Sequence, residues 1–515
     1  MSCVCYVFDL EACLTIAPPS NISINRSEKI IMQQESLKKR TIKGTMWSAA
    51  DAFLGQGVTF LVGLILARLL SPDEYGLIGI CLIFTTVLNG VVDSGFSNAL
   101  IRKNNVTDKD YNTMFLTNML ISIILYIILF FTSPFISSFF NSNELTPLLR
   151  TTGLVLLFNG LTLVQQTILT KRIDFKAKTK ASVVSSVISG ISGIVLAYIG
   201  FGVWALVVQV VSRQFLYSVS IFIINRWIPA LIFSRSSFKY LWGFGWKLLV
   251  SGLLNNIWNQ FNQIVVGRFY SPASLGQFTR SQQFAALFSE NFSGIIQRVS
   301  LPVLSSIQDE KERLVYVYRR IIKQTMFISI IIMFSLAAVS EPFVLTIIGP
   351  QWHEAATYLP LISISLCWYP LNALNLNMLQ ILGRSDIFLC LEFVKKALAI
   401  VPFRIGIFIS IYWMLIASAC LGFVSFILNS WYTGKKLQYN SWQQLCDIKP
   451  SFFIGLSIAI PIYFVKYLPV DSMFLILAIQ ILMGIVIFFF ISTLSKNTEY
   501  KELLAILKSL MIRLI

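Results

Sequence analysis

Two arginines share one face of a long, mostly apolar stretch near the middle of the chain. Arg280 and Arg298 are eighteen residues apart, which is five full turns of an α-helix. Asn291 falls close to the same face, and Glu290 stands about 80° aside. Guanidinium groups bind phosphate oxygens bidentately, so this face suits an anionic ligand such as a pyrophosphate. Alternatively, both arginines extend along their apolar stems toward water, because they lie near the ends of the stretch.

The preceding apolar stretch carries a second polar face. It contains one lysine and a series of hydroxyl and amide residues: Lys247, Ser251, Asn255, Asn256, Asn259, Gln260, Asn262 and Gln263. Several of them, Lys247 and Asn255 included, fall within about 80° of one another on a helical wheel. Unsatisfied amides are costly in lipid, so this face either seals a helix interface or lines a water-filled cavity. We favour the cavity, where amides beside Trp246 and Trp258 would suit sugar hydroxyls and ring faces.

Other charged residues also fall inside apolar stretches. Arg213 lies about ten residues into one of them, roughly 15 Å along a helix, where a buried partner or a cavity is expected. A secondary basic cluster contains Lys395, Lys396 and Arg404. The spacing of Glu392 and Lys396 predicts an ion pair, which leaves Lys395 and Arg404 in excess.

Three carboxylates, Asp51, Asp93 and Glu290, also fall within apolar stretches. They either balance the cations or bind a coupling proton or sodium ion, and we favour charge balance. The chain has a single histidine, His353, and neither a P-loop nor a Ser-His-Asp grouping or metal-ligand spacing. We therefore expect neither enzymatic activity nor a cofactor or metal.

The elements that hold these residues are predicted to be membrane-spanning helices. Hydrophobic residues make up 56% of the 515 residues and charged residues 13%, which is too few charges for a soluble domain. Apolar runs long enough to cross a bilayer recur along the chain. We predict an all-α integral membrane protein with about fourteen spans: 46–70, 76–101, 111–133, 150–170, 179–200, 203–224, 241–267, 276–304, 321–349, 355–382, 386–412, 413–433, 450–468 and 471–493.

The basic residues predict the orientation. The net charge of +17 first suggests nucleic acid, but the cations lie in short stretches between apolar runs, as membrane topology requires. With the N-terminus inside, 30 of the 41 lysines and arginines fall on inner segments, and Arg68, Arg150, Arg268 and Lys466 lie at outer ends. This bias predicts a multi-pass protein of the cell inner membrane with both termini cytoplasmic, and no nucleic-acid partner.

The two ends of the chain are predicted to be tails. Residues 1–45 form the N-terminal tail, and we expect 1–31 to be disordered or foreign to the native protein, with Met32 as the natural start. Residues 494–515 alternate Lys and Glu with leucines, which predicts an amphipathic helix on the membrane surface.

A short internal repeat joins spans in the two halves. Residues 67–76 read ARLLSPDEYG and residues 267–276 read GRFYSPASLG, so four identical positions recur at a shift of 200. Ser-Pro suits any helix start, so chance is one explanation. A duplicated half with the same orientation is the other, and transporters built this way bind substrate between the halves.

Five segments, two of which contain the copies of this repeat, give the chain a family resemblance. They are residues 47–76, 93–103, 265–283, 301–320 and 379–388. In their order and spacing the sequence resembles the polysaccharide flippases of the MOP (multidrug/oligosaccharidyl-lipid/polysaccharide) exporter superfamily. It most resembles the branch that includes the colanic-acid-type and teichuronic-acid-type exporters. The similarity runs from about residue 38 to 495.

The resemblance implies two pseudo-symmetric six-helix lobes, at 46–224 and 225–433, and two C-terminal helices within 434–493. It implies that an undecaprenyl-pyrophosphate-linked oligosaccharide moves from the inner to the outer leaflet by alternating access, for a surface polysaccharide such as lipopolysaccharide. Polysaccharide polymerase and chain-length machinery are expected as partners. Cavities of this family are cationic, which Arg280, Lys247 and Arg213 would match.

Two alternatives predict different features. A multidrug or cation exporter of the same superfamily should have an acidic, aromatic cavity, whereas the charges within the predicted spans are mainly basic. A membrane polymerase, ligase or glycosyltransferase needs an active site, typically on a large outer loop, and the predicted outer loops are short.

Overall fold

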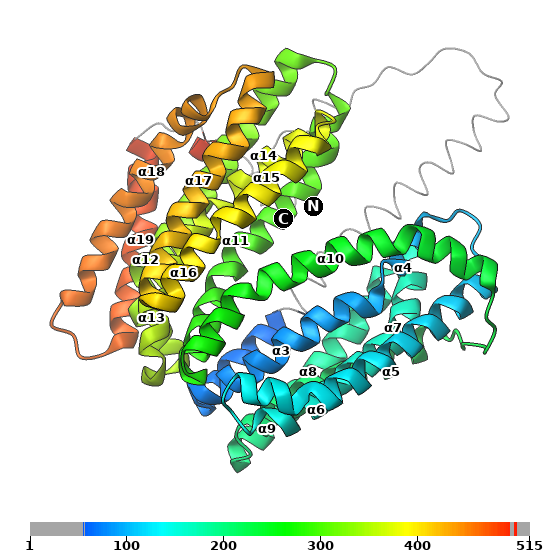
Figure 1. Cartoon of the computed structure of the whole chain (residues 1–515). Helices are drawn as coiled ribbons and strands as arrows, with labels where there is room; N and C mark the ends of the chain where they lie inside the picture. The colour runs from blue at the N-terminus through cyan, green and yellow to red at the C-terminus, as the bar shows by residue number, and fades with distance from the viewer. Residues whose placement is uncertain (1–54, 56, 495–498, 502–515) are drawn as a thin grey trace, which may run out of the picture. The chain divides into compact units, whose positions relative to one another are not determined.

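The computed structural model describes residues 55, 57–494 and 499–501, and its secondary structure within these ranges is helical, without a strand (Figure 1). The N-terminal tail and Asp51 lie outside the described residues, as does most of the C-terminal tail. Contacts divide the chain into two compact units, which meet in sequence between Gly276 and Gln277. The predicted lobes meet between 224 and 225 instead, and that assignment stays a prediction.

The first unit is a bundle of helices that follows a helical segment at 57–69. Its helices are α3 (Pro72–Asp93), α4 (Phe96–Arg102), α5 (Asp108–Phe139), α6 (Leu145–Thr152), α7 (Leu154–Lys171), α8 (Phe175–Ile199), α9 (Val203–Asn225) and α10 (Arg235–Phe269). Helix α8 packs against α9, α5 against α7, and α10 runs along α3 (Figure 1). Helix α3 also contacts α7 and α9, so it lies at the centre of this bundle.

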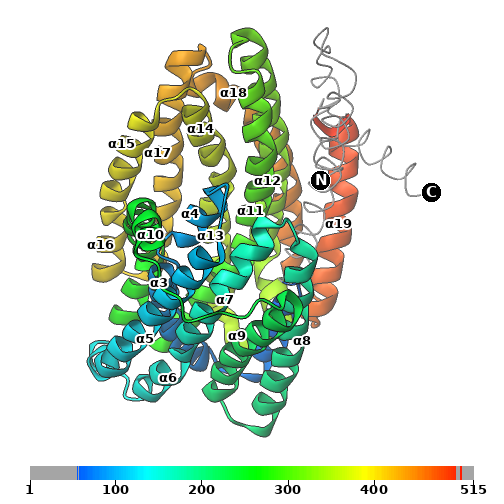
Figure 2. The ribbon, with the colours of Figure 1, turned by 90° about the vertical axis from the view of Figure 1, so that its right-hand side faces the viewer.

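The second unit contains the larger part of α11 (Pro272–Ser306) and the helices that follow it. These are α12 (Lys311–Ile348), η2 (Pro350–Trp352), α13 (His353–Cys367), α14 (Tyr369–Ile381), α15 (Ser385–Leu398), α16 (Ile400–Phe408), α17 (Ile411–Leu437), α18 (Ser441–Phe464), η3 (Val465–Tyr467) and α19 (Met473–Leu494). Helix α12 contacts α13, α14, α18 and α19, and α19 lies beside α12 and α18 (Figure 2).

The expected all-α membrane fold is confirmed. The predicted spans are helical over most of their described residues, and ten helices in the described part of the chain are long and apolar enough to cross a membrane. The other predicted spans are 46–70, which is described only in part, and 241–267, 276–304 and 386–412. The last three hold most of the candidate site residues, whose polar side chains lower the mean hydropathy of these spans.

Four predicted spans are interrupted, and one of them, 150–170, breaks at Gly153 between α6 and α7. The span 76–101 breaks between α3 and α4, where Ser94 and Gly95 adopt positive φ values of 49° and 69°. Glycine adopts this left-handed conformation readily, which lets the chain turn between the two helices. The spans 355–382 and 386–412 break at Trp368 and Ala399, which keep helical dihedrals but lie between separate helices.

The internal repeat coincides with two helix starts in close contact. Pro72 begins α3 and Pro272 begins α11, each after a serine whose hydroxyl accepts a backbone N–H three residues on. A Cβ built on Gly76 would lie 1.8 Å from the carbonyl oxygen of Pro272, and one on Gly276 would lie 2.0 Å from that of Pro72. The two turns therefore approach backbone to backbone in a reciprocal way, which only glycine permits.

Candidate functional site

The polar face predicted for residues 241–267 lies on α10, and much of it is exposed. Lys247, Ser251, Asn255 and Asn259 follow one another at four-residue spacing, and each side chain is exposed. We call these four residues the α10 polar stripe. It contains the predicted substrate-binding residues Lys247, Asn255 and Asn259.

Close backbone packing fixes the side of α10 that faces its own unit. A Cβ on Gly245 would lie 2.6 Å from the carbonyl oxygen of Ser94, so α10 touches the turn between α3 and α4 directly. Farther along, a Cβ on Gly90 would lie 2.3 Å from the amide nitrogen of Asn256. Asn256 therefore packs against α3, whereas its neighbour Asn255 is exposed, so the amides of α10 divide into packing residues and accessible residues.

Arg213 and Asp93 lie in the same unit as the stripe. Arg213 is half-buried on α9, and α9 and α10 both pack against α3. Asp93 ends α3 and accepts a hydrogen bond from the hydroxyl of Ser97. Arg213 and the stripe are thus carried by helices that share α3 as a neighbour.

Polar side chains bind α11 to α13 within the second unit. Gln277 accepts the backbone N–H of Ala355 at 2.9 Å, and Ser281 donates to the carbonyl of the same residue at 2.7 Å. Ser289 donates to the carbonyl of Leu366, also at 2.7 Å. These three residues of α11 lie four and eight residues apart, on one face, so that face is fixed against α13.

The residues of the predicted arginine face differ in exposure. Arg280 is 8% exposed, and its Nη1 donates to Oε1 of Gln283 at 2.9 Å. Arg298, Glu290 and Asn291 are exposed on the same helix. Arg280 is therefore the fixed, buried cation of α11, and the exposure of Arg298 also fits the alternative of an arginine that reaches for water.

The secondary basic cluster lies on α15 and α16. An ion pair joins Lys395 to Glu392, three residues before it, where sequence spacing predicts a pair between Glu392 and Lys396. Lys396 is half-buried and Arg404 is exposed. Helix α15 packs against α14, α16 and α17, whereas the arginine-bearing α11 is bound to α13.

A buried amide network was not predicted from the sequence. Asn375 donates to Gln444 at 3.0 Å and accepts the hydroxyl of Thr433 at 2.7 Å, and Asn429 donates to Asn372 at 2.7 Å. It joins α14, α17 and α18. The recurrence of asparagine in the apolar segment 372–377 is the signal that could have indicated it.

An ionic cluster at one end of the second unit was also missed. Asp447 of α18 is paired with Arg319 and with Lys323, the latter at 3.3 Å, and accepts the hydroxyl of Tyr439 at 2.8 Å. The Asp447 side chain is only 7% exposed. This cluster fixes α12 to the junction of α17 and α18, and among the described residues no group of three or more His, Cys, Asp or Glu could hold a metal.

A family model described as "Polysaccharide biosynthesis protein" matches residues 65–357, more than half of the chain. The chain belongs to this family. The matched range includes the internal repeat, all of α10 and all of α11. The candidate residues Asp93, Arg213, Lys247, Arg280 and Arg298 therefore fall in the part that defines family membership.

Curated proteins of polysaccharide synthesis are similar to this family member. The succinoglycan biosynthesis transport protein ExoT of Rhizobium meliloti is 24% identical over 64% of this chain and 66% of its own length. The teichuronic acid biosynthesis protein TuaB of Bacillus subtilis is 23% identical over 82% of this chain and 89% of its own length. The expected resemblance to teichuronic-acid-type proteins is confirmed.

Two solved structures share the fold of this polysaccharide biosynthesis protein. The lipid II flippase MurJ, in an inward closed conformation, superposes with a TM-score of 0.67 at 18% identity and covers 88% of this chain and 98% of its own. An inward-facing MATE family multidrug resistance transporter of the MOP superfamily gives a TM-score of 0.58 at 17% identity and covers 77% of this chain and 99% of its own. The expectation of a MOP-type fold is confirmed.

Proposed function

We propose that this protein flips an undecaprenyl-pyrophosphate-linked oligosaccharide repeat unit from the inner to the outer leaflet by alternating access, for surface polysaccharide biosynthesis. The observation that carries the proposal is the exposed α10 polar stripe in a member of a polysaccharide biosynthesis family. Its similarity to ExoT and its MurJ-type fold support transport rather than enzymatic catalysis.

The stripe offers the chemistry that an oligosaccharide needs. Ser251, Asn255 and Asn259 present donors and acceptors to sugar hydroxyls, and Lys247 adds a cation at one end. Bilayer hydrocarbon cannot satisfy such groups, so a row of them on an exposed helix face supports a water-filled path. The path allows hydroxyls to exchange water for protein partners as the sugar moves.

We assign the basic residues to binding the pyrophosphate and compensating its charge. A diphosphate cannot enter hydrocarbon without compensation, because moving an ion from water to a low-dielectric medium costs on the order of 20 kcal/mol. Arg280, buried and hydrogen-bonded to Gln283, is the best-fixed cation for this role. Within the first unit, Lys247 and Arg213 are further candidate cations. Arg298 and Asn291 would contact the same ligand farther along α11.

The remaining charged residues have other assignments. We assign Asp93, Glu290 and Asp51 to charge compensation rather than to ion coupling, and Lys395, Lys396 and Arg404 to a secondary basic surface. A cation exporter, the main alternative, requires the opposite sign within the membrane. We also propose the orientation that the basic residues predict, with both termini cytoplasmic, in the inner membrane, beside the polymerase and chain-length machinery.

Deletion of the gene tests this function. The proposal predicts that complete lipid-linked repeat units accumulate on the cytoplasmic leaflet while surface polysaccharide is lost, and that the intact gene restores both. The mass of the accumulated lipid would identify the cargo. Unchanged sugar pools together with increased sensitivity to toxic cations would instead support the drug exporter.

A further inference from the structure

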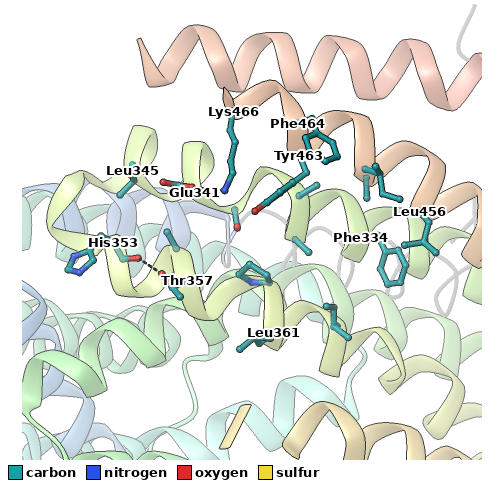
Figure 3. Close-up of a pocket in the computed structure, with 18 of the residues that line it drawn as sticks. Phe334, Glu341, Leu345, His353, Thr357, Leu361, Leu456, Tyr463, Phe464 and Lys466 are labelled. Atoms are coloured by element: carbon teal, nitrogen blue, oxygen red, sulfur yellow. Dashed lines mark hydrogen bonds and ion pairs between the residues drawn. The ribbon is translucent and has the colours of Figure 1, made fainter. Parts of the chain in front are cut away.

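A groove of about 640 Å³ lies within the second unit, among α12, α13, α17 and the end of α18 (Figure 3). Its body is apolar and includes Phe334 of α12, Leu361 and Ile364 of α13, and Leu456 and Ile460 of α18. Its volume is within the range of small-molecule sites. None of its lining residues is among the candidate substrate residues.

One end of the groove is charged. Lys466 and Glu341 form an ion pair at 3.5 Å, and Lys466 Nζ lies 4.2 Å from the ring centre of Tyr463. Figure 3 shows Lys466 and Glu341 at the same end as His353, with Phe334 and Leu456 at the other. Side-chain exposures of 22% for Lys466 and 49% for Glu341 leave both charges accessible.

The charged end lies at the depth where a membrane boundary is expected. On α12, Glu341 is twenty-two residues beyond Arg319 of the Asp447 cluster, which is about 33 Å of helix. This matches the hydrocarbon thickness of about 30 Å, so the two ionic groups have the spacing expected of opposite interfaces. From Lys466 to Leu456 is about 15 Å, so the apolar body reaches from one interface to the midplane. The groove is one leaflet deep.

We propose that this groove binds a phospholipid whose headgroup carries both a phosphate and a primary ammonium, as phosphatidylethanolamine does. Lys466 pairs with the phosphate, Glu341 with the ammonium, and an acyl chain fills the apolar body. The balanced pair favours a zwitterionic headgroup, because the phosphate of an anionic lipid would leave Glu341 beside a like charge. A membrane-spanning partner helix would need a groove across the whole bilayer. This inference requires only that the chain spans a membrane and is independent of the proposed cargo.

Native mass spectrometry of the full-length protein, released from nanodiscs with equal phosphatidylethanolamine and phosphatidylglycerol, tests the site. We expect wild type to retain phosphatidylethanolamine over phosphatidylglycerol by about tenfold. Glu341→Gln should remove this preference, and Ile460→Trp should reduce retention of either lipid by filling the apolar body. Lys449→Gln is the matched control, because Lys449 lies on α18 but does not line the groove, and it should behave as wild type.

A charge-swapped protein separates headgroup recognition from folding. Glu341→Lys combined with Lys466→Glu keeps an ion pair and should keep the preference, with the two headgroup contacts exchanged. Equal retention of both lipids by wild type would overturn the proposal. So would a preference that Glu341→Gln leaves unchanged, or a second protein chain retained in place of lipid.

Discussion

At the residue scale, the adjacent amides Asn255 and Asn256 have different environments. Asn255 is exposed on the polar stripe, and Asn256 packs against Gly90 of α3. A single step along the helix, about 100°, thus separates an amide free to meet substrate from one committed to packing. Substitution of each can distinguish substrate contact from folding.

We predict that Asn255→Leu with Asn259→Leu lowers polysaccharide export by about tenfold without lowering the amount of protein in the membrane. Two lost hydrogen bonds of about 0.5–1.5 kcal/mol each account for this factor. The measurement is surface polymer normalised to membrane abundance. Asn256→Leu is the comparison, and it should instead reduce abundance, because the larger side chain must fit against α3. Equal export by the double variant and wild type would remove the stripe from the substrate path.

Arg280 gives a second prediction at this scale. Arg280→Ala should impair export while the protein stays folded in the membrane, and Arg280→Lys should restore only part of it, since lysine keeps the charge but loses bidentate geometry. Export and membrane abundance are measured together. Arg384→Ala is the control, because Arg384 precedes α15 and is paired with Asp386 in the first turn of that helix. Normal polymer output from Arg280→Ala at normal abundance would exclude Arg280 from the site.

At the element scale, the two repeat turns contact each other through their backbones at Gly76 and Gly276. We therefore predict that neither position tolerates a side chain. Gly76→Ala and Gly276→Ala should each strongly reduce membrane abundance or export, because the Cβ would collide with a carbonyl oxygen rather than with a flexible side chain. Gly252→Ala on α10 is the control: its Cβ meets nothing within 4 Å, and alanine favours helix by about 0.5–1 kcal/mol. Wild-type behaviour of both repeat variants would contradict the close approach.

The Asp447 cluster predicts how the second unit is stabilised. Asp447→Asn should lower the free energy of unfolding by about 2 kcal/mol, since the carboxylate accepts from a tyrosine and pairs with two cations. Thermal unfolding in detergent measures the effect. Glu310→Gln is the control, because the Glu310 side chain is 57% exposed and its pair with Arg313 contributes little. An unchanged melting temperature for Asp447→Asn would show that the cluster does not stabilise the unit.

Helix positions and faces could be predicted from the sequence, but helix partners could not. The starts at Pro72 and Pro272 follow from local Ser-Pro chemistry, and the α10 stripe follows from helical periodicity. The burial of Arg280 and the pairing of Asn375 with Gln444 depend on helices distant in sequence, so neither was expected. The groove was also unforeseen, because its lining comes from five helical segments, α12, α13, α17, α18 and η3.

For the whole molecule, the distribution of polarity supports transport. Ten helices of the described part each contain an apolar stretch long enough to cross a membrane, whereas α10, α11 and the pair α15 and α16 carry more charges and amides within predicted spans. A purely structural membrane bundle would have little use for exposed amides on a long helix, because lipid cannot satisfy them. The basic excess in these helices fits the anionic cargo that we propose.

Reconstitution tests this central claim most directly. Purified protein is incorporated into proteoliposomes that carry the lipid-linked repeat unit extracted from the deletion strain, and the fraction of sugar reached by an external glycosidase is followed over time. We predict that the protein moves the inner-leaflet repeat units outward, and that the Asn255→Leu, Asn259→Leu protein does so about tenfold more slowly. If the accessible fraction is the same with and without protein, at matched lipid composition and under an imposed proton or sodium gradient, the chain is not a flippase for this lipid.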